Sequence, residues 1–285
     1  MKILTIIGSS GFLGRSFIDF ACKEGLSKWR IKKIVSISRS KIYFKKSRKI
    51  EIKHLSRDIS KLKKLPKTDY IIYAVNSENK NLNLKAIKNF SFLINKLSKK
   101  TKILFTSSGA IYGKIKNKEK YSTNKIFNEK IFKFYGALGY QVSIARLFTF
   151  IGERILNDRR YAISDFVQSG LSKKQIYVKS NSLVYRSYMH SYDMVNWLMT
   201  ILLNSNINCP TYDVGSDEKI KIQNLAKIIG KIFNKPVKIK KINNKKVENY
   251  VPSIKKAKKE LNLKINYKLR PSLYSIIKHK YAKKN

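Results

Sequence analysis

The stretch Gly8-Ser9-Ser10-Gly11-Phe12-Leu13-Gly14 decides how this sequence of 285 residues is interpreted. An apolar, β-branched run over residues 2–7 precedes it, and residues 12–24 after it carry apolar side chains at helical spacing. Glycines between a strand and a helix permit a tight turn and let backbone N–H groups approach a pyrophosphate. The first turn of the helix adds partial positive charge for the phosphates. We therefore expect a dinucleotide to bind here, at Gly8, Ser10, Gly11, Phe12, Leu13 and Gly14.

Strands and helices alternate along the first half of the chain. Apolar, β-branched runs predict strands at 31–38, 50–55, 70–75, 103–106 and 142–146, and helical spacing predicts helices at 82–97 and 121–135. This alternation predicts βαβ units, and right-handed crossovers then give an α/β fold with a doubly wound parallel sheet of the Rossmann type. After about residue 150 the pattern loosens, so we expect a smaller C-terminal α+β domain.

The expected domain boundaries follow from this change of pattern. Residues 1–150 form the predicted dinucleotide-binding domain, to which residues 187–205 return. Residues 151–186 and 206–285 form the predicted substrate-binding domain, and 278–285 are expected to be frayed.

The composition narrows the class of protein. Hydrophobic residues make up 43% of the chain, which is enough for a large buried core. The two cysteines, Cys22 and Cys209, are isolated and lack metal-ligand spacing, so we expect no metal site and favour a reducing compartment. No run reaches the roughly 18 apolar residues that span a bilayer, and the first apolar run is too short for a secretion signal. We expect a cytoplasmic protein without a membrane partner.

The charge balance is strongly positive. The formal net charge is +45, from 62 Lys and Arg against 17 Asp and Glu. Such an excess attracts phosphates and nucleic acid alike. The lysines are spread over the whole length, together with abundant Ile and Asn, as an AT-rich coding sequence would produce. We therefore favour compositional drift that also steers an anionic substrate, and we do not expect nucleic acid as the partner.

Two further segments are candidates for the adenosine end of the dinucleotide. The second predicted strand ends in Ser38-Arg39, where an acidic side chain would accept from the ribose 2′-OH of NAD. Arginine instead suits a 2′-phosphate, so NADP(H) is favoured as cofactor and NAD remains possible. Asp58 and Ile59 follow the third strand, where an acid can accept from the adenine amino group or equally cap the N-terminus of a helix. Small residues that let a cofactor lie close follow the fourth strand, at Ala74, Val75 and Asn76.

A candidate catalytic set comes from Ser108, Tyr121 and Lys125. Tyr121 and Lys125 are four residues apart and so share one helix face. A free tyrosine has a pKa of about 10, and a nearby ammonium lowers it by favouring the phenolate. Ser108, at the end of the fifth predicted strand, can bind the same substrate oxygen as Tyr121. Together they can move a proton while hydride moves to or from a nicotinamide.

Several motifs carry a family resemblance. They are Gly8–Gly14, Asn83-x-x-Ala86-Ile87-x-Asn89, Thr106-Ser107-Ser108-Gly109-Ala110-Ile111-Tyr112-Gly113, Tyr121-x-x-x-Lys125, Arg146–Gly152, Arg186–Met194 and Tyr212–Ser216. With them the chain resembles the extended short-chain dehydrogenase/reductases, and specifically the NAD-dependent epimerase/dehydratase family that acts on nucleotide sugars. The resemblance runs from residue 1 to about residue 265.

The resemblance implies a nucleotide-diphosphate sugar as substrate. Arg186 would grip its diphosphate, and the segment with Leu147 would touch the nicotinamide. Thr149 and Asp165 stand where the family often has asparagines that hydrogen-bond the nucleotide or sugar. The resemblance also implies a homodimer formed through the helix of Lys125 and its neighbour. Ile126, Phe127, Ile131 and Phe134 are candidates for its apolar contacts and equally for the core.

The choice of reaction rests on a few positions. Dehydratases of this family carry Asp-Glu directly after the strand Ser/Thr, whereas Ser108 is followed by Gly109 and Ala110, which argues against dehydration. Two reactions stay open: reduction of a 4-keto sugar for deoxysugar or surface-polysaccharide synthesis, and 4-epimerisation with tightly held NAD. Arg39 and the short loop from Gly113 to Tyr121 favour the reductase. A non-catalytic RNA-binding or cofactor-sensing protein on the same fold is a third possibility, against which the intact catalytic set argues.

Overall fold

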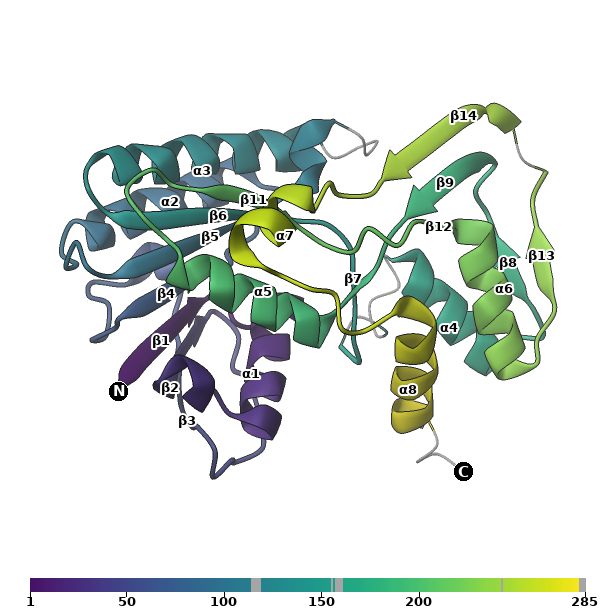
Figure 1. Cartoon of the computed structure of the whole chain (residues 1–285), viewed down its shortest axis with the longest axis horizontal. Helices are drawn as coiled ribbons and strands as arrows, with labels where there is room; N and C mark the ends of the chain where they lie inside the picture. Colours follow the sequence, from purple (N-terminus) through teal and green to yellow (C-terminus); the bar gives the residue numbers. More distant parts are fainter. Residues whose placement is uncertain (114–118, 155, 157–160, 242, 282–285) are drawn as a thin grey trace. The chain divides into compact units, whose positions relative to one another are not determined.

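The computed structural model of the protein describes residues 1–113, 119–154, 156, 161–241 and 243–281 (Figure 1). It contains two compact units. The first unit comprises Met1–Leu147 and Val195–Asp213, and the second comprises Phe148–Met194 and Val214 onward. The predicted boundaries at residues 150 and 187–205 differ from these. The first turn of the helix that begins at Ser191 belongs to the second unit and not to the first. The reason is that the Asp193 carboxylate accepts hydrogen bonds from Asn266 and Tyr267.

A seven-stranded sheet forms the centre of the first unit, in the order β11-β6-β5-β4-β1-β2-β3. From β3 to β6 all neighbouring strands are parallel. The strand order reverses between β1 and β4, and in such sheets ligands bind outside the carboxyl ends of the strands at the point of reversal. The strands are β1 (Lys2–Ile7), β2 (Ile31–Ser38), β3 (Glu51–Ser56), β4 (Tyr70–Tyr73), β5 (Lys102–Ser108), β6 (Gln141–Leu147) and β11 (Thr211–Val214).

Helices cover both faces of this sheet, with α2 and α3 on one side and α1 and α5 on the other (Figure 1). The apolar core under α2 and α3 contains stacked rings: Phe105 and Phe132 lie parallel with centroids 4.5 Å apart, and both are fully buried. The helices and short 3₁₀ turns are α1 (Phe12–Glu24), α2 (Lys80–Ile94), α3 (Glu119–Ala137), α5 (Ser191–Leu203), η1 (Ser27–Trp29), η2 (Ile59–Lys61) and η3 (Gly109–Tyr112).

The second unit mixes small sheets with helices. In it β9 (Ser182–Arg186) lies between β12 (Ile220–Lys221) and β14 (Asn243–Tyr250), antiparallel to the former and parallel to the latter. Two parallel pairs join β7 (Phe150–Ile151) to β10 (Met189–His190) and β8 (Ile176–Val178) to β13 (Val237–Ile239). The helices are α4 (Ala162–Ser172), α6 (Ile222–Phe233), α7 (Lys255–Leu261) and α8 (Leu269–Tyr281).

The predicted α/β fold with a doubly wound parallel sheet is confirmed, and one local prediction was wrong. Residues 220–221 form a strand directly before α6, where they pair with β9. Residues 278–281 belong to α8 instead of fraying, since the apolar side of that helix, with Leu273, Ile276 and Ile277, is buried. Residues 282–285 lie outside the described part of the chain. Among the described residues, no helix is both long and apolar enough to cross a membrane.

Candidate functional site

The turn between β1 and α1 has the geometry of a phosphate-binding loop. Gly8 has a φ of +87°, and a Cβ there would lie 2.5 Å from the carbonyl oxygen of Ala74, so only glycine fits. A Cβ on Gly14 would overlap the backbone of Ser9. Gly11 differs, because the nearest protein atom to its Cβ position is 3.7 Å away. The fold itself does not require glycine at 11, so the open space above it and the first turn of α1 suit a ligand phosphate.

The carboxyl end of β2 lies beside this loop. Gly8 donates its backbone N–H to the Ile37 carbonyl at 2.8 Å, which joins the loop to the end of β2. Ser38 is buried and donates to the Ser40 carbonyl at 2.8 Å. Arg39 is exposed, and its carbonyl accepts from Ser56 Oγ at 3.1 Å. The Arg39 backbone is therefore bonded to β3, at the edge of the sheet where the phosphate loop lies.

The segment after β3 is held in place from α2. Asp58 is the N-cap of η2, and its Oδ1 accepts from the Ser60 backbone N–H at 2.8 Å. The Asn89 side chain of α2 donates to the carbonyls of Ile59 and Leu62, at 2.6 and 2.9 Å. Asn89 is thus the residue that fixes this candidate adenine-binding turn. The sequence showed Asn89 only as part of a helix motif. Its two partners, Ile59 and Leu62, lie 30 and 27 residues earlier in the sequence, so local spacing does not reveal these bonds.

Ser108 and Lys125 lie at the carboxyl ends of the central strands, with Tyr121 beside Lys125. Ser108 is 6% exposed at the end of β5, and its hydroxyl accepts from the Ala110 backbone N–H at 3.2 Å. The Lys125 Nζ on α3 donates to the carbonyls of Thr106 (2.8 Å) and Val75 (3.3 Å), which bridges β5 and the end of β4. Tyr121 is half-buried, with its ring centroid 5.8 Å from that Nζ.

Burial changes the acidity of the candidate lysine. Lys125 is 4% exposed, and loss of hydration lowers the pKa of its ammonium from 10.5 to about 8, with Glu129 acting in the opposite direction. Near neutral pH the side chain therefore still carries its charge next to Tyr121. A charge at this position favours the phenolate form of a neighbouring tyrosine. This is the electrostatic arrangement that proton transfer by a tyrosine requires.

A network around Arg146 supports this set and was not foreseen from the sequence. Arg146 holds both Glu129 carboxylate oxygens, at 3.0 and 2.8 Å, and donates to the Tyr112 hydroxyl at 2.8 Å. The Tyr112 hydroxyl in turn donates to Asp213 at 2.9 Å. The bonds to Glu129 raise the pKa of Arg146, so its charge is permanent. The network fixes α3, which carries Lys125, against β6 and against the turn after Ser108.

The remaining candidate cofactor contacts line the same edge of the sheet. Ala74, Val75 and Asn76 follow β4, and the Ala74 backbone N–H donates to the Ile7 carbonyl at 2.8 Å. Leu147 ends β6 and pairs with Ser108. The predicted cofactor and catalytic residues thus lie at, or on segments that follow, the carboxyl ends of β1 to β6 or, for Tyr121 and Lys125, on α3. The loop whose short length favoured a reductase includes residues 114–118, which lie outside the described part of the chain.

The predicted substrate residues Thr149, Asp165 and Arg186 belong to the second unit. The Thr149 hydroxyl is buried without a partner among the described residues, and Asp165 is half-buried in the first turn of α4. Arg186 donates to the Tyr185 carbonyl at 2.9 Å and pairs with Glu248 at 3.0 Å. Glu248 was absent from the sequence-based site. No local spacing links it to Arg186, since β14 reaches β9 only through the tertiary fold.

A surface depression of about 430 Å³ lies elsewhere, at the amino ends of β1, β2 and β3, and its lining includes Arg30, Lys32, Arg48 and Lys49. It is at the opposite edge of the sheet from Ser108 and Lys125 and takes no part in the site. Within the described ranges, no group of three or more His, Cys, Asp and Glu side chains is arranged to hold a metal ion.

The family model of the NAD dependent epimerase/dehydratase family matches residues 4–215. The chain belongs to this family. A curated relative is UDP-glucuronic acid decarboxylase 5 of Arabidopsis thaliana, which is 26% identical over 145 residues, or 50% of this chain and 42% of the relative. The chain spans less than half the length of the curated relatives it matches.

Solved structures of a dehydratase and an epimerase that act on nucleotide sugars share the fold. The dTDP-glucose 4,6-dehydratase of Bacillus anthracis, in complex with NAD, superposes with a TM-score of 0.78 at 14% identity, covering 99% of this chain and 97% of the other. The UDP-glucose 4-epimerase of Thermotoga maritima, with UDP-glucose, gives a TM-score of 0.76 at 14% identity and covers 99% of both chains. The family model therefore confirms the expected membership of the NAD-dependent epimerase/dehydratase family, and the solved structures confirm the fold.

Proposed function

We propose that this family member transfers hydride at C4 of a nucleotide-diphosphate sugar, using NADP(H) and Tyr121 as acid/base. The proposal rests on the arrangement at the carboxyl ends of neighbouring strands. The glycine loop follows β1, Ser108 ends β5, and Lys125 bonds to the ends of β4 and β5 with Tyr121 beside it. The NAD and UDP-glucose complexes of the structural neighbours support a dinucleotide and a nucleotide sugar as its ligands.

The chain's own residues handle the proton. Ser108 donates a hydrogen bond to the sugar C4 oxygen and fixes it next to the Tyr121 hydroxyl. In the reducing direction Tyr121 gives its proton to that oxygen, and the Lys125 ammonium stabilises the phenolate that remains. The bound dinucleotide supplies the hydride that C4 receives. In the oxidising direction the same groups take the proton from the C4 hydroxyl.

We favour a 4-ketoreductase over the alternatives for two reasons. Gly109 and Ala110 follow Ser108, so the loop offers no carboxylate for proton transfer at neighbouring carbons. Arg39 at the end of β2 suits a 2′-phosphate, and a reductase exchanges NADPH in every cycle. A 4-epimerase with tightly held NAD is the second candidate, favoured by the likeness to the epimerase structure.

The dinucleotide that co-purifies with the protein, together with product analysis, tests this proposal. The purified protein is denatured, any dinucleotide is identified by mass spectrometry, and 4-keto nucleotide sugars are then incubated with NADPH or NADH. Consumption of NADPH with formation of a 4-hydroxy sugar is expected. Retained NAD with interconversion of UDP-glucose and UDP-galactose indicates the epimerase. Carbon dioxide released from UDP-glucuronic acid indicates the decarboxylation of the curated relatives. Absence of any dinucleotide binding contradicts all three.

The choice of NADP(H) has its own test in Arg39→Asp. A bidentate bond to phosphate contributes about 1.5–3 kcal/mol, so we expect NADPH affinity to fall roughly ten- to a hundredfold while NADH affinity holds or improves. The control is Arg48→Asp, which makes the same charge change at an exposed arginine outside the site. Equal losses in the two variants, or an unchanged ratio of KM values for the two cofactors, contradict the preference.

Arg186 is the residue proposed to bind the substrate diphosphate, and Glu248 must give way when it does. A diphosphate carries more negative charge than a carboxylate and fits the guanidinium fork. Glu248 therefore competes with the substrate for Arg186. We expect Glu248→Gln to lower KM for the nucleotide sugar and Arg186→Gln to raise it. An unchanged KM in both variants contradicts the assignment.

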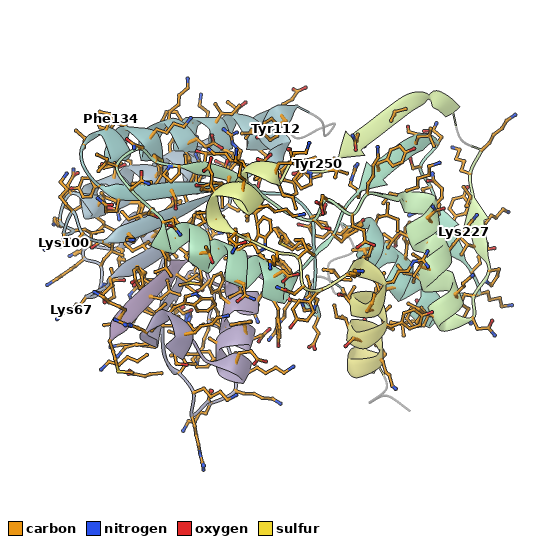
Figure 2. All side chains as sticks on the ribbon, viewed as in Figure 1. Lys67, Lys100, Tyr112, Phe134, Lys227 and Tyr250 are labelled. Carbon is orange, nitrogen blue, oxygen red and sulfur yellow. The ribbon has the colours of Figure 1, made fainter. Side chains whose placement is uncertain are left out.

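The proposed oligomer is a homodimer through α2 and α3, as the resemblance implies. Phe134 is 58% exposed and Phe127 is 40% exposed on α3, and Phe92 is 52% exposed on α2. Figure 2 labels Phe134. Light scattering tests this, with Phe134→Asp expected to shift the dimer to monomer and Tyr274→Asp, on α8, expected to leave it unchanged. A monomeric wild-type protein contradicts the proposal.

A further inference from the structure

A chain of three polar side chains crosses the interior of the first unit. Ser36 Oγ donates to Ser9 Oγ at 2.7 Å and lies 3.0 Å from His54 Nδ1. Ser9 and Ser36 have no exposed surface. The other ring nitrogen of His54, Nε2, is buried without a partner in the described part of the chain. Buried polar groups cost free energy unless they are bonded, so the unbonded Nε2 of His54 is a cost that a purely structural role does not explain.

The direction of the hydrogen bond between Ser36 and His54 follows from the number of hydrogens that a serine hydroxyl can donate. A serine hydroxyl has one hydrogen, and that of Ser36 is directed to Ser9. The bond between Ser36 and His54 therefore uses the N–H of Nδ1 as donor. The chain runs from His54 through Ser36 to Ser9, and each member orients the next.

The three members stand on three different segments of the candidate dinucleotide site. Ser9 follows Gly8 in the phosphate loop, where its backbone lies against Gly14. Ser36 lies two residues before Ser38 on β2. His54 lies opposite Ser36 on β3, four residues before Asp58. One buried chain thus joins the loop proposed for the pyrophosphate to the strand ends proposed for the 2′-position and the adenine.

We propose that Ser9, Ser36 and His54 are positioning residues that set the adenosine end of the dinucleotide site. The inference rests on the proposed function, because it needs the glycine loop to bind a dinucleotide. These three side chains act on ground-state binding of the cofactor. They do not act on the reacting atoms, which lie at Ser108 and Tyr121. Its loss raises the KM for dinucleotide and leaves kcat at saturating cofactor unchanged.

The same unit contains a matched control for the buried bond. Ser143 Oγ and Ser205 Oγ are 2.7 Å apart and buried, with 0% and 3% exposure. Ser143 lies on β6, which is separated from β1 by β5 and β4. Ser143→Ala therefore removes a buried serine–serine bond of the same length without touching the dinucleotide loop.

The test compares Ser36→Ala with Ser143→Ala in the full chain. Dissociation constants for NADPH and NADH are measured by nucleotide fluorescence, and thermal midpoints by scanning calorimetry. We expect both variants to lose stability similarly, and only Ser36→Ala to bind the dinucleotide more weakly, by about tenfold for one lost buried bond. Equal affinities for Ser36→Ala and Ser143→Ala overturn the inference while leaving the proposed function intact. A wild-type protein that binds neither dinucleotide overturns both.

Variants of His54 separate positioning from simple packing. An asparagine amide can stand where Nδ1 stands and donate to Ser36, whereas leucine fills space without a donor. We expect His54→Asn to retain near wild-type affinity and His54→Leu to weaken it like Ser36→Ala. His54→Gln, whose amide stands near the place of Nε2, is the comparison of equal polarity and should not rescue binding. The same affinity in all three variants overturns the role of His54.

Discussion

At the residue scale, the candidate chemistry depends on a lysine that burial makes less basic. Lys125 bridges the ends of two strands through its bonds to the carbonyls of Thr106 and Val75, and it brings its charge next to Tyr121. Burial therefore serves two ends at once: it fixes the position of the ammonium and strengthens its effect on the phenol, since charges interact more strongly away from water.

Removal of the Tyr121 hydroxyl tests its role directly. We expect Tyr121→Phe to bind dinucleotide with affinity within about twofold of wild type and to lose roughly 10²- to 10⁴-fold in turnover, the usual contribution of a general acid/base. Isothermal calorimetry and steady-state kinetics measure the two effects. Tyr274→Phe, at an exposed tyrosine of α8, should change neither. Near-normal turnover in Tyr121→Phe would remove the basis of the proposed mechanism.

The buried charge of Lys125 predicts a dependence of stability on pH. Its pKa falls from 10.5 to about 8 in the folded protein, so the unfolded chain binds more protons between these values. This group therefore destabilises the fold fully below pH 8, and its penalty disappears as pH rises toward 10.5. We expect Lys125→Met to be inactive and, relative to wild type, more stable at pH 7 than at pH 10, with a change of up to about 3 kcal/mol.

Urea unfolding at pH 7 and pH 10 measures this change. The control is Lys130→Met, an exposed lysine of the same helix, for which the difference from wild type should not depend on pH. A stability difference between Lys125→Met and wild type that stays constant over this range would contradict the buried-charge argument.

At the scale of the elements, the β1–α1 turn separates structural from ligand-binding glycines. Gly8 is required by its φ of +87° and by the Ala74 carbonyl, whereas a Cβ on Gly11 meets no protein atom closer than 3.7 Å. The two glycines belong to one sequence motif, but glycine is needed at position 8 for the backbone and is proposed at position 11 to leave space for a ligand.

This difference predicts opposite outcomes for two alanine substitutions. We expect Gly8→Ala to destabilise the fold by about 2 kcal/mol or more, because strained backbone and overpacking add. Gly11→Ala should keep its thermal midpoint within a few degrees and lose dinucleotide affinity at least tenfold. Calorimetry and fluorescence titration decide between them. A Gly11→Ala protein that binds dinucleotide normally would mean that the space above Gly11 is not the phosphate site.

At the scale of the whole molecule, the net charge of +45 sets a large self-repulsion. Lysines such as Lys67 and Lys100 in the first unit and Lys227 in the second are exposed and point outward (Figure 2). Charges on such a surface repel over a screening distance of about 30 Å at 0.01 M salt and about 8 Å at 0.15 M. The excess charge therefore lowers stability most when salt is scarce.

Salt should consequently stabilise this protein. We expect the thermal midpoint to rise by several degrees between about 0.01 and 0.3 M sodium chloride, and the rise to shrink when Lys67, Lys100 and Lys227 are all replaced by glutamate. Sucrose in place of salt controls for effects unrelated to charge. A midpoint that is flat or falls with salt would show that ion pairs outweigh repulsion.

The sequence by itself determined what depends on local spacing. The glycine turn, the six strands that pair in parallel and the shared helix face of Tyr121 and Lys125 could all be predicted, because each follows from residues a few positions apart. Element ends depend on tertiary pairing, as at residues 220–221, which form a strand before α6 because they pair with β9. The candidate cofactor and catalytic residues could also be named from the sequence. They follow predicted strands, and a parallel sheet brings the carboxyl ends of its strands to one edge.

Only the tertiary structure decided which distant polar groups meet. Strand register and packing create three such sets of bonded side chains. They are Arg146 with Glu129 and Tyr112, Arg186 with Glu248, and Ser9 with Ser36 and His54. A chain with 62 basic and 17 acidic residues allows far too many pairings for sequence spacing to choose among them. The choice is made by burial, because a polar group taken from water must find its partner at the one place that the fold provides.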